Sequence, residues 1–309
     1  MRKQEPSDIQ SLIPPNRDYR YFEGWRENRF QAVTELASVN AWWLSEAALL
    51  AYADERFIET TFESSGLAQA GYQTDFVSGP ASTHCFLAHG PDFVLVAFRG
   101  TEIMDFVASL KNWLTNLRVS LIPDGRGGRV HEGFQLALDG VWDPLRKRIV
   151  RVLAQGNPGR RVWLTGHSLG AALATLATSR AMAEGAFPVG GLYTFGSPRV
   201  GDAAFARRLH NSAPAVRTFR FVNYADIVTR IPPPLRYRHV GRLCYFTKLG
   251  RLQPRQPGWL WQLVRVVRDE VGDLLGPAPL SLKVPKILED HAPIKYAIRT
   301  WNHHDAQRA

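Results

Sequence analysis

Cysteine and long apolar runs are both scarce in this 309-residue chain. Its two cysteines, Cys85 and Cys244, are too few and too scattered for the disulfide framework of a small secreted domain, so we expect free thiols. A run of about 18 uncharged apolar residues, which a membrane-spanning helix needs, does not occur. The N-terminus also lacks the apolar core of a secretion signal. We therefore expect a cytoplasmic protein, or a secreted one from which a leader has been removed.

Motifs that bind nucleic acids, nucleotides or metals are missing as well. The net charge of +10 would attract anionic surfaces, but the chain has no zinc-finger spacing, no phosphate-binding glycine loop and no block of consecutive Lys and Arg. His303 and His304 lack a supporting third metal ligand and are expected in a frayed tail. We predict neither a nucleic-acid partner nor a metal site, and the sequence leaves the oligomeric state open.

What the chain does contain is the helix and strand alternation of an α/β protein. Residues 1–40 form a polar, aromatic N-terminal arm, Asn40 is expected to cap a first helix, and a hairpin ends in the apolar strand 93–98. The elements predicted after it are helices at 134–153, 171–183 and 202–210 and strands at 161–164, 190–195 and 216–222. Strands joined through helices pair in parallel with right-handed crossovers, which predicts a sheet between two helical layers.

A change in composition near residue 231 divides the C-terminal third without requiring a second domain. We interpret 1–309 as a single domain with an accessory insertion at 241–276. A candidate functional residue, His291, lies beyond the insertion, so the chain must return to the first domain after it. Within it, the Trp- and Arg-rich residues 257–268 suit adsorption to an anionic lipid surface. A packed surface helix explains the same residues equally well.

The most informative segment joins an apolar strand to a helix of small residues. It has the pattern G-x-S-x-G: Gly166, His167, Ser168, Leu169, Gly170. The two glycines allow a sharp strand-to-helix turn that presents the serine hydroxyl at the carboxyl edge of the sheet. The Leu169 N–H, at the start of the helix, can then face a developing oxyanion. The alternative is a serine that only caps the helix.

Five ordered blocks together resemble the class 3 lipase family, the fungal-type triacylglycerol lipases, and the similarity runs from about residue 41 to residue 301. The blocks are Phe98 to Thr101, Val130 to Phe134, Thr165 to Ala171, Tyr193 to Asp202 and Asn223 to Val228. The resemblance implies an α/β-hydrolase fold with a mostly parallel central sheet flanked by helices. It also implies cleavage of carboxylic esters of glycerolipids, no metal or cofactor, and a lid.

A serine hydroxyl needs a histidine base and an acid that orients it, and α/β-hydrolases carry them in the order Ser, acid, His. Asp226 directly follows an apolar strand and matches the family's aspartate, whereas Asp202 looks like a helix N-cap. For the base, the residues around His291 resemble the family's C-terminal block. His239 is the alternative, although the family has a similar pattern in a structural strand.

The resemblance also assigns a second oxyanion residue and a lid. Thr101, directly after the strand 93–98, occupies the family's position for the oxyanion residue, and its N–H would act with that of Leu169. Residues 102–117 follow with an apolar stripe at helical spacing, so we predict a lid helix there, an ordinary core helix being the alternative. The lid and acyl-binding candidates are Ile103, Met104, Phe106, Val107, Leu110 and Trp113.

These residues predict a triacylglycerol lipase or esterase with a Ser168–His291–Asp226 triad, an ester lipid as substrate and transient contact with a lipid interface. A phospholipase A1-type hydrolase is the alternative within this class. A non-catalytic lipid-binding protein on the same fold is the rival from another class, although a pure binder has no use for the strained serine turn. We expect structural roles for His131 and Arg199.

Overall fold

The computed structural model describes residues 2–6, 8–80, 83–101, 120–212, 217–256 and 289–308. The predicted lid at 102–117 and the part of the predicted insertion from 257 to 276 lie outside these residues. The six lid and acyl-binding candidates lie outside them too: Ile103, Met104, Phe106, Val107, Leu110 and Trp113.

An eight-stranded sheet in the order β1-β2-β3-β6-β7-β8-β9-β10 forms the centre of the molecule. The five strands from β3 to β9 in that order pair in parallel, and the pairs β1–β2, β2–β3 and β9–β10 are antiparallel. The bounds are β1 Gln73–Ser78, β2 His84–His89, β3 Phe93–Phe98, β6 Arg161–His167, β7 Val189–Phe195, β8 Arg217–Asn223, β9 Arg242–Phe246 and β10 Leu252–Gln253. A small second sheet pairs β4 Leu121–Pro123 with β5 Arg129–His131. The predicted hairpin and mostly parallel sheet are confirmed.

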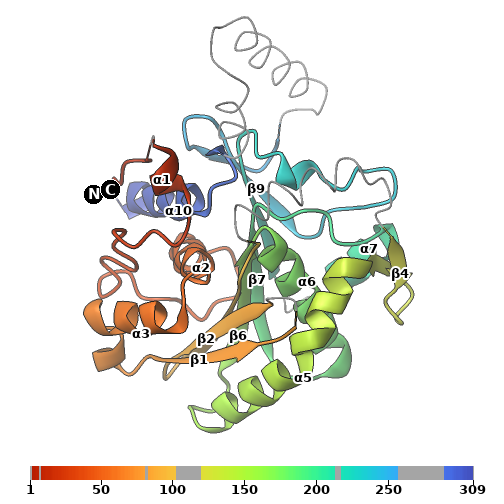
Figure 1. Ribbon diagram of the computed structural model, residues 1–309, viewed down its shortest axis with the longest axis horizontal. Coiled ribbons are helices and arrows are strands. Elements are labelled where there is room, and N and C mark those ends of the chain that lie inside the picture. Colours follow the sequence, from red (N-terminus) through yellow and green to blue (C-terminus); the bar gives the residue numbers. More distant parts are fainter. Residues whose placement is uncertain are drawn as a thin grey trace, which may run out of the picture.

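Helices cover both faces of the sheet, with α5 and α6 on one side and α2 and α10 on the other (Figure 1). Their bounds are α1 Ile9–Leu12, α2 Ser38–Leu50, α3 Glu55–Ser64, α5 Glu132–Ala154, α6 Leu169–Glu184, α7 Ala203–Asn211 and α10 Pro293–Arg308, with short 3-10 turns at Ala68–Ala70 and Val228–Arg230. None of the helices within the described ranges has both the length and the apolarity of a membrane crossing.

The side chains of the central strands alternate between two separate cores, as the twofold period of a strand requires. On β3, for example, Val94 and Val96 pack with α5 and α6, whereas Phe93, Leu95 and Ala97 face the opposite core. We call the α5/α6 side the aliphatic face, because Val, Leu, Ile and Ala supply most of its side chains. The residues on the other side form the aromatic face.

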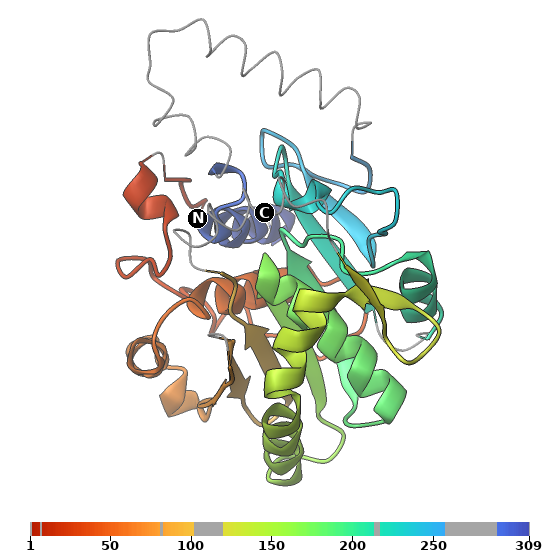
Figure 2. The same cartoon turned by 45° about the vertical axis from the view of Figure 1, so that its right-hand side comes forward.

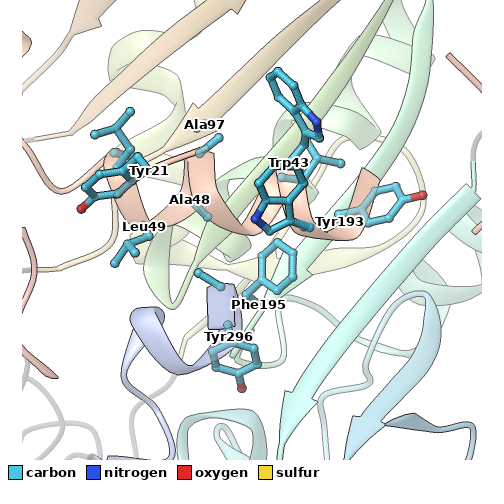
Figure 3. Close-up of a cluster of buried hydrophobic side chains, with 14 of the residues drawn as sticks. Tyr21, Trp43, Ala48, Leu49, Ala97, Tyr193, Phe195 and Tyr296 are labelled. Carbon is cyan, nitrogen blue, oxygen red and sulfur yellow. The ribbon is translucent and has the colours of Figure 1, made fainter. Parts of the chain in front are cut away.

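The aromatic face is built from parts of the chain that lie far apart in the sequence. Trp43 of α2 belongs to the same buried cluster as Tyr193 and Phe195 of β7, and Tyr296 of α10 adjoins Phe195 (Figure 3). The rings of Phe195 and Tyr296 are 5.9 Å apart at an angle of 64°, an edge-on contact that aromatic quadrupoles favour. The N-terminal arm, α2 and α10 therefore close this side of the sheet together.

The two chain ends lie side by side above this face (Figure 2). The side chain of Asn302 accepts a hydrogen bond from the Lys3 N–H at 2.7 Å and donates one to the Lys3 carbonyl at 2.9 Å. Both backbone groups of an arm residue are thus paired with α10, as a neighbouring strand would pair them.

Two sequence predictions about helix ends are wrong for the same reason, which is tertiary hydrogen bonding. Asn40 lies inside α2, where its side chain pairs with the backbone N–H and carbonyl of Gln31 at 2.9 and 2.6 Å instead of capping the helix. The expected frayed tail at His303 and His304 is helical. His304 is 8% exposed and its ring contacts Ser38 and Asn28, each at 2.9 Å.

Candidate active site

Ser168 occupies the turn between β6 and α6 with a backbone conformation that few non-glycine residues adopt. Its φ is 58° and its ψ is −124°, and its N–H donates to the Phe195 carbonyl at 3.1 Å. Such strained conformations cost about 1–3 kcal/mol and gather at functional sites. The side chain makes no capping hydrogen bond to α6, whose residues are all described, so the helix-cap interpretation of Ser168 is wrong.

The glycines on either side of Ser168 are required by close backbone contacts. A Cβ at Gly166 would lie 2.3 Å from the carbonyl carbon of Gly170, and one at Gly170 would lie 2.1 Å from the carbonyl oxygen of Phe98. Neither collision could be relieved by a side-chain movement, because the obstructing atoms belong to the backbone. The G-x-S-x-G spacing therefore fixes α6 against the ends of β3 and β6.

Asp226 and His291 form a buried hydrogen-bonded pair. The Nδ1 of His291 lies 3.0 and 2.9 Å from the two carboxylate oxygens of Asp226, and the exposed fractions are 6% and 0% respectively. Because a carboxylate only accepts, the Nδ1 must carry the hydrogen of this contact. That tautomer leaves Nε2 as the basic nitrogen of the neutral ring.

The Asp226 carboxylate receives two further hydrogen bonds. The Tyr296 hydroxyl donates to Oδ2 at 2.6 Å, and the Val228 N–H donates to Oδ1 at 2.9 Å. Burial and the neighbouring Asp226 charge raise the pKa of Tyr296 well above its ordinary value, so this hydroxyl keeps its proton. A buried carboxylate with three donors is fixed in place and needs no water to stabilise its charge.

His167 connects this pair to the serine turn. Its Nε2 lies 2.6 Å from the carbonyl oxygen of His291, and the two imidazole rings are 4.3 Å apart. Its Nδ1 lies 2.8 Å from the Tyr52 hydroxyl, so Nε2–H donates to the carbonyl and Nδ1 accepts from the tyrosine. Burial and the nearby His291 lower the pKa of His167 well below 6.5, which keeps the ring neutral. The residue next to Ser168 thus holds the backbone of His291.

Gly196 shows how tightly the same region is packed. A Cβ there would lie 2.9 Å from both Asp226 Oδ2 and His291 Cε1. Its φ of +59° is also one that side chains rarely adopt. A side chain at this position would collide with both the acid and the base.

Thr101 and Leu169 flank the serine turn from two directions. Gly100, directly before Thr101, is so close to the turn that a Cβ on it would lie 2.8 Å from the His167 carbonyl oxygen and 2.0 Å from the Tyr52 hydroxyl. Leu169 is the first residue of α6, where the N–H groups of a helix have no intrahelical acceptor. Both predicted oxyanion residues therefore adjoin the backbone around Ser168.

The alternative triad residues have structural roles instead. Asp202 caps α7 by accepting from the Phe205 N–H at 2.8 Å, and His239 Nε2 contacts the Thr229 carbonyl at 2.7 Å. Burial and two nearby arginines lower the pKa of His239 well below 6.5. Asp202 thus supports the start of α7, and His239 supports the backbone at Thr229.

The structural roles expected for His131 and Arg199 are also visible. His131 caps α5 by accepting from the Phe134 N–H at 3.4 Å. Arg199 donates to the carbonyl oxygens of Arg230 and Pro232, the latter at 2.7 Å, and so anchors the loop that follows β7. In the part of the chain that the structure describes, no three His, Cys, Asp or Glu side chains are grouped as metal ligands.

Two residues of the site were not found by sequence reasoning. Tyr52 lies just beyond the end of α2 and carries no motif, so nothing in the sequence marks its contact with His167. Tyr296 follows His291 by about one helical turn, within the block around His291 that resembles the family, but the sequence assigns it no role of its own. Its hydrogen bond to Asp226 depends on how α10 packs against β8.

A family model described as "Lipase (class 3)" matches residues 95–235. Over this segment the chain belongs to the class 3 lipase family. The matched segment begins within β3 and contains the serine turn and Asp226, whereas His291 lies beyond it. The fold is that of an α/β-hydrolase, as the sequence predicts.

Individual relatives of this class 3 lipase segment include enzymes of two kinds. A secreted mono- and diacylglycerol lipase A of Penicillium cyclopium is 36% identical over 156 residues, which are 50% of this chain and 48% of that protein. A chloroplastic phospholipase A(1) of Arabidopsis thaliana is 36% identical over 163 residues, which are 45% and 33% of the two chains. The chain thus spans half or less of these curated relatives.

A solved structure aligns over more of the chain. The Rhizomucor miehei triacylglyceride lipase aligns with a TM-score of 0.56 and 26% identity, and the alignment covers 68% of this chain and 80% of that one.

Proposed function

We propose that this protein is a serine hydrolase of carboxylic esters, in which Ser168 is the nucleophile, His291 the base and Asp226 the acid that orients it. The observation that carries the proposal is the buried Asp226–His291 pair, held by His167 beside the strained turn of Ser168. Each part has a use in acyl transfer, and the strain at Ser168 has none in a protein that only binds lipid.

Catalysis would proceed in two steps. The Nε2 of His291 takes the Ser168 proton as the hydroxyl attacks the ester carbonyl, and the imidazolium then returns that proton to the departing alcohol. Water, activated by the same nitrogen, releases the carboxylic acid from the acyl-enzyme. Asp226 stabilises the imidazolium in both steps, because Tyr296 and Val228 hold its carboxylate against Nδ1.

The N–H groups of Thr101 and Leu169 would bind the oxyanion. Negative charge develops on the carbonyl oxygen only in the transition state, so donors fixed before the reaction lower the barrier without binding the substrate more tightly. Loss of one such donor typically lowers the rate by about 10²- to 10³-fold. The close approach of the Gly100 and Gly170 backbones to their neighbours supports this assignment, because it brings both segments next to the serine turn.

Acylglycerols are the substrate class we propose, on the strength of the mono- and diacylglycerol lipase and triacylglyceride lipase relatives. A phospholipase A1-type reaction is the second candidate, because the plant phospholipase A(1) is 36% identical, as is the fungal lipase. Both reactions use the same triad and differ in the headgroup of the lipid. Either reaction would include a transient contact with a lipid interface.

Replacement of Ser168 by Ala tests the function. Turnover of p-nitrophenyl esters should fall by at least about 10⁴-fold, and labelling by a fluorophosphonate should disappear, because no other hydroxyl occupies the turn. Ser179→Ala is the matched control, since Ser179 is also a buried serine but lies within α6. Ester hydrolysis retained in Ser168→Ala would refute the proposal.

A substrate panel then separates the two candidates. Rates on mono-, di- and triacylglycerols would be compared with rates on phosphatidylcholine and phosphatidylglycerol, and the released fatty acid measured in each case. Faster release from the phospholipids would replace the acylglycerol assignment by the phospholipase A1-type one.

A further inference from the structure

Arg299 of α10 is a buried cation that joins three distant parts of the chain. It is 4% exposed, and its Nε and Nη2 donate to the two carboxylate oxygens of Glu5 at 2.8 and 3.1 Å. Its Nη1 donates to the side-chain oxygen of Asn223 and, at 3.0 Å, to the Thr247 carbonyl. A planar guanidinium with these partners cannot rotate without breaking several bonds at once.

Asn223 links Arg299 to the segments that carry the acid–base pair. It is fully buried at the end of β8, three residues before Asp226, and its side-chain N–H donates to the Asp290 carbonyl at 2.8 Å. Its backbone N–H donates to the Tyr296 hydroxyl at 2.9 Å, and that hydroxyl donates in turn to Asp226. Through its side-chain amide and its backbone N–H, Asn223 thus contacts both the residue before His291 and the tyrosine that holds the acid.

A second cation fixes the other side of the His291 turn. Lys295, also 4% exposed, pairs with Glu289 and lies 3.8 Å from the Glu5 carboxylate. Glu5 therefore faces two buried cations, Lys295 and Arg299, from the N-terminal arm. The pairing of Lys3 with Asn302 holds the arm in that position.

We propose that Glu5, Arg299 and Asn223 are positioning residues, here called the brace, which set the distance and angle between Asp226 and His291. The inference rests on the hydrolase function proposed above and adds a role for the N-terminal arm, which no triad motif includes. None of the three brace residues touches the reacting atoms. They act because the acid is on the end of β8 and the base on the turn before α10, two segments that the brace joins.

The brace has a catalytic consequence because general-base catalysis is sensitive to geometry. A displacement of about 1 Å in a reacting group can cost about 10²-fold in rate, whereas substrate binding depends on other surfaces. Weakening the brace should therefore lower kcat and leave KM nearly unchanged. A residue that only stabilised the fold would instead lower the fraction of active protein and leave kcat per active site unchanged.

Asn223→Asp is the sharpest variant, because it keeps the size of the side chain and the acceptor for Arg299 but removes the donor to the Asp290 carbonyl. It also adds a negative charge, facing Arg299 and the Asp290 carbonyl, to the buried region that holds Asp226 and Tyr296. We expect kcat to fall by about 10- to 100-fold. The acid limb of the kcat/KM profile should move to higher pH, because added negative charge stabilises the imidazolium.

Glu5→Gln is the milder variant and tests the arm itself. It keeps one acceptor oxygen for Arg299 and removes the negative charge, so kcat should fall by about 3- to 10-fold with KM nearly unchanged. Arg17→Gln is the matched control on the same arm, since the Arg17–Asp54 pair has side-chain exposures of 60% and 57% and lies outside the brace. This control should retain the wild-type kcat.

The whole 309-residue chain is used throughout, and the end-point of fluorophosphonate labelling counts correctly folded sites. A lower kcat per labelled site in both brace variants, with the pH shift in Asn223→Asp, supports the inference. Wild-type kcat per labelled site and an unmoved pH profile overturn it while the proposed hydrolase function stands. A wild-type protein that neither labels nor hydrolyses esters overturns both.

Discussion

The two faces of the sheet are built by different means. The helices α5 and α6 of the aliphatic face come from one continuous part of the chain, 132–184, and pack Val, Leu, Ile and Ala against the strands. The aromatic face takes its helices and its arm from the two ends of the chain and packs Trp, Tyr and Phe. The first face depends on local sequence, and the second on contacts between residues up to 299 positions apart.

Buried polar groups add to the difference. Glu46 on the aromatic face is completely buried, and its carboxylate accepts from the Tyr19 hydroxyl at 2.6 Å, the Trp42 indole N–H at 2.9 Å and the Phe22 N–H at 3.1 Å. Such contacts are directional, so they fix the arm in one register on α2, which apolar packing alone does less well. The candidate acid–base pair lies next to this face, where Tyr296 and α10 support it.

The largest expected effect comes from truncating a large side chain on each face. Trp42→Ala should lower the free energy of unfolding by about 3–5 kcal/mol, since Trp42 is fully buried and packs 4.8 Å from Trp301 of α10. Leu145→Ala on the aliphatic face should cost about 2–5 kcal/mol, because Leu145 is equally buried. Chemical denaturation measures both.

Activity measurements on the same two variants test whether only the aromatic face affects the candidate site. At a temperature where both remain folded, Trp42→Ala should reduce kcat on a soluble ester, because a loosened α10 carries His291 with it. Leu145→Ala should leave kcat unchanged. Equal kcat in the two variants would contradict the special link between the aromatic face and the site.

A smaller effect is expected from Asp290, whose pKa is raised to about 6, mainly by burial, although Lys295 and Arg299 act in the opposite direction. The folded state binds this proton more tightly than the unfolded chain does, so stability is lost as the pH rises from about 4 to about 6. Asp290→Asn should therefore raise the free energy of unfolding by about 1–3 kcal/mol at pH 8 and change little at pH 4. Denaturant titrations at the two pH values test this, and a loss of stability at pH 8 would contradict it.

The smallest effect concerns His131, which caps α5 on the aliphatic face. Burial lowers the pKa of His131 to about 4, so the unfolded chain binds its proton more tightly and stability is lost as the pH falls from about 6.5 to about 4. Asn also caps helices but does not titrate. The free energy of unfolding of His131→Asn, measured relative to wild type, should therefore be about 1–2 kcal/mol higher at pH 5 than at pH 8. Thermal unfolding at both pH values checks the sign, and an equal difference at each would count against it.

Much of the aliphatic side could be predicted from the sequence. The strands β3, β6, β7 and β8 and the helices α5, α6 and α7 all lie within a few residues of their predicted bounds. The order of these elements predicts parallel pairing, because each crossover must return the chain to the same edge of the sheet. Strand β1, at the edge next to the N-terminal region, was not predicted, since its burial is only partial and its alternation weak.

On the aromatic side the sequence predicted less. The interpretation of Asn40 as a cap and of His303 and His304 as a frayed tail both failed, because distant partners overrode local preference. The identities of Asp226 and His291 as site candidates came from chain order and family resemblance. Their roles stay a prediction that Ser168→Ala and the brace variants test.

The sequence by itself determined the serine turn, because G-x-S-x-G between an apolar strand and a small-residue helix allows few other backbone paths, and all the atoms involved lie close along the chain. Only the tertiary structure decided which acid, base and tyrosine meet and that Glu5 faces Arg299 from 294 residues away. Those contacts form at the end of β8 and the start of α10. Packing of the whole aromatic face, and no local propensity, sets the distance between them.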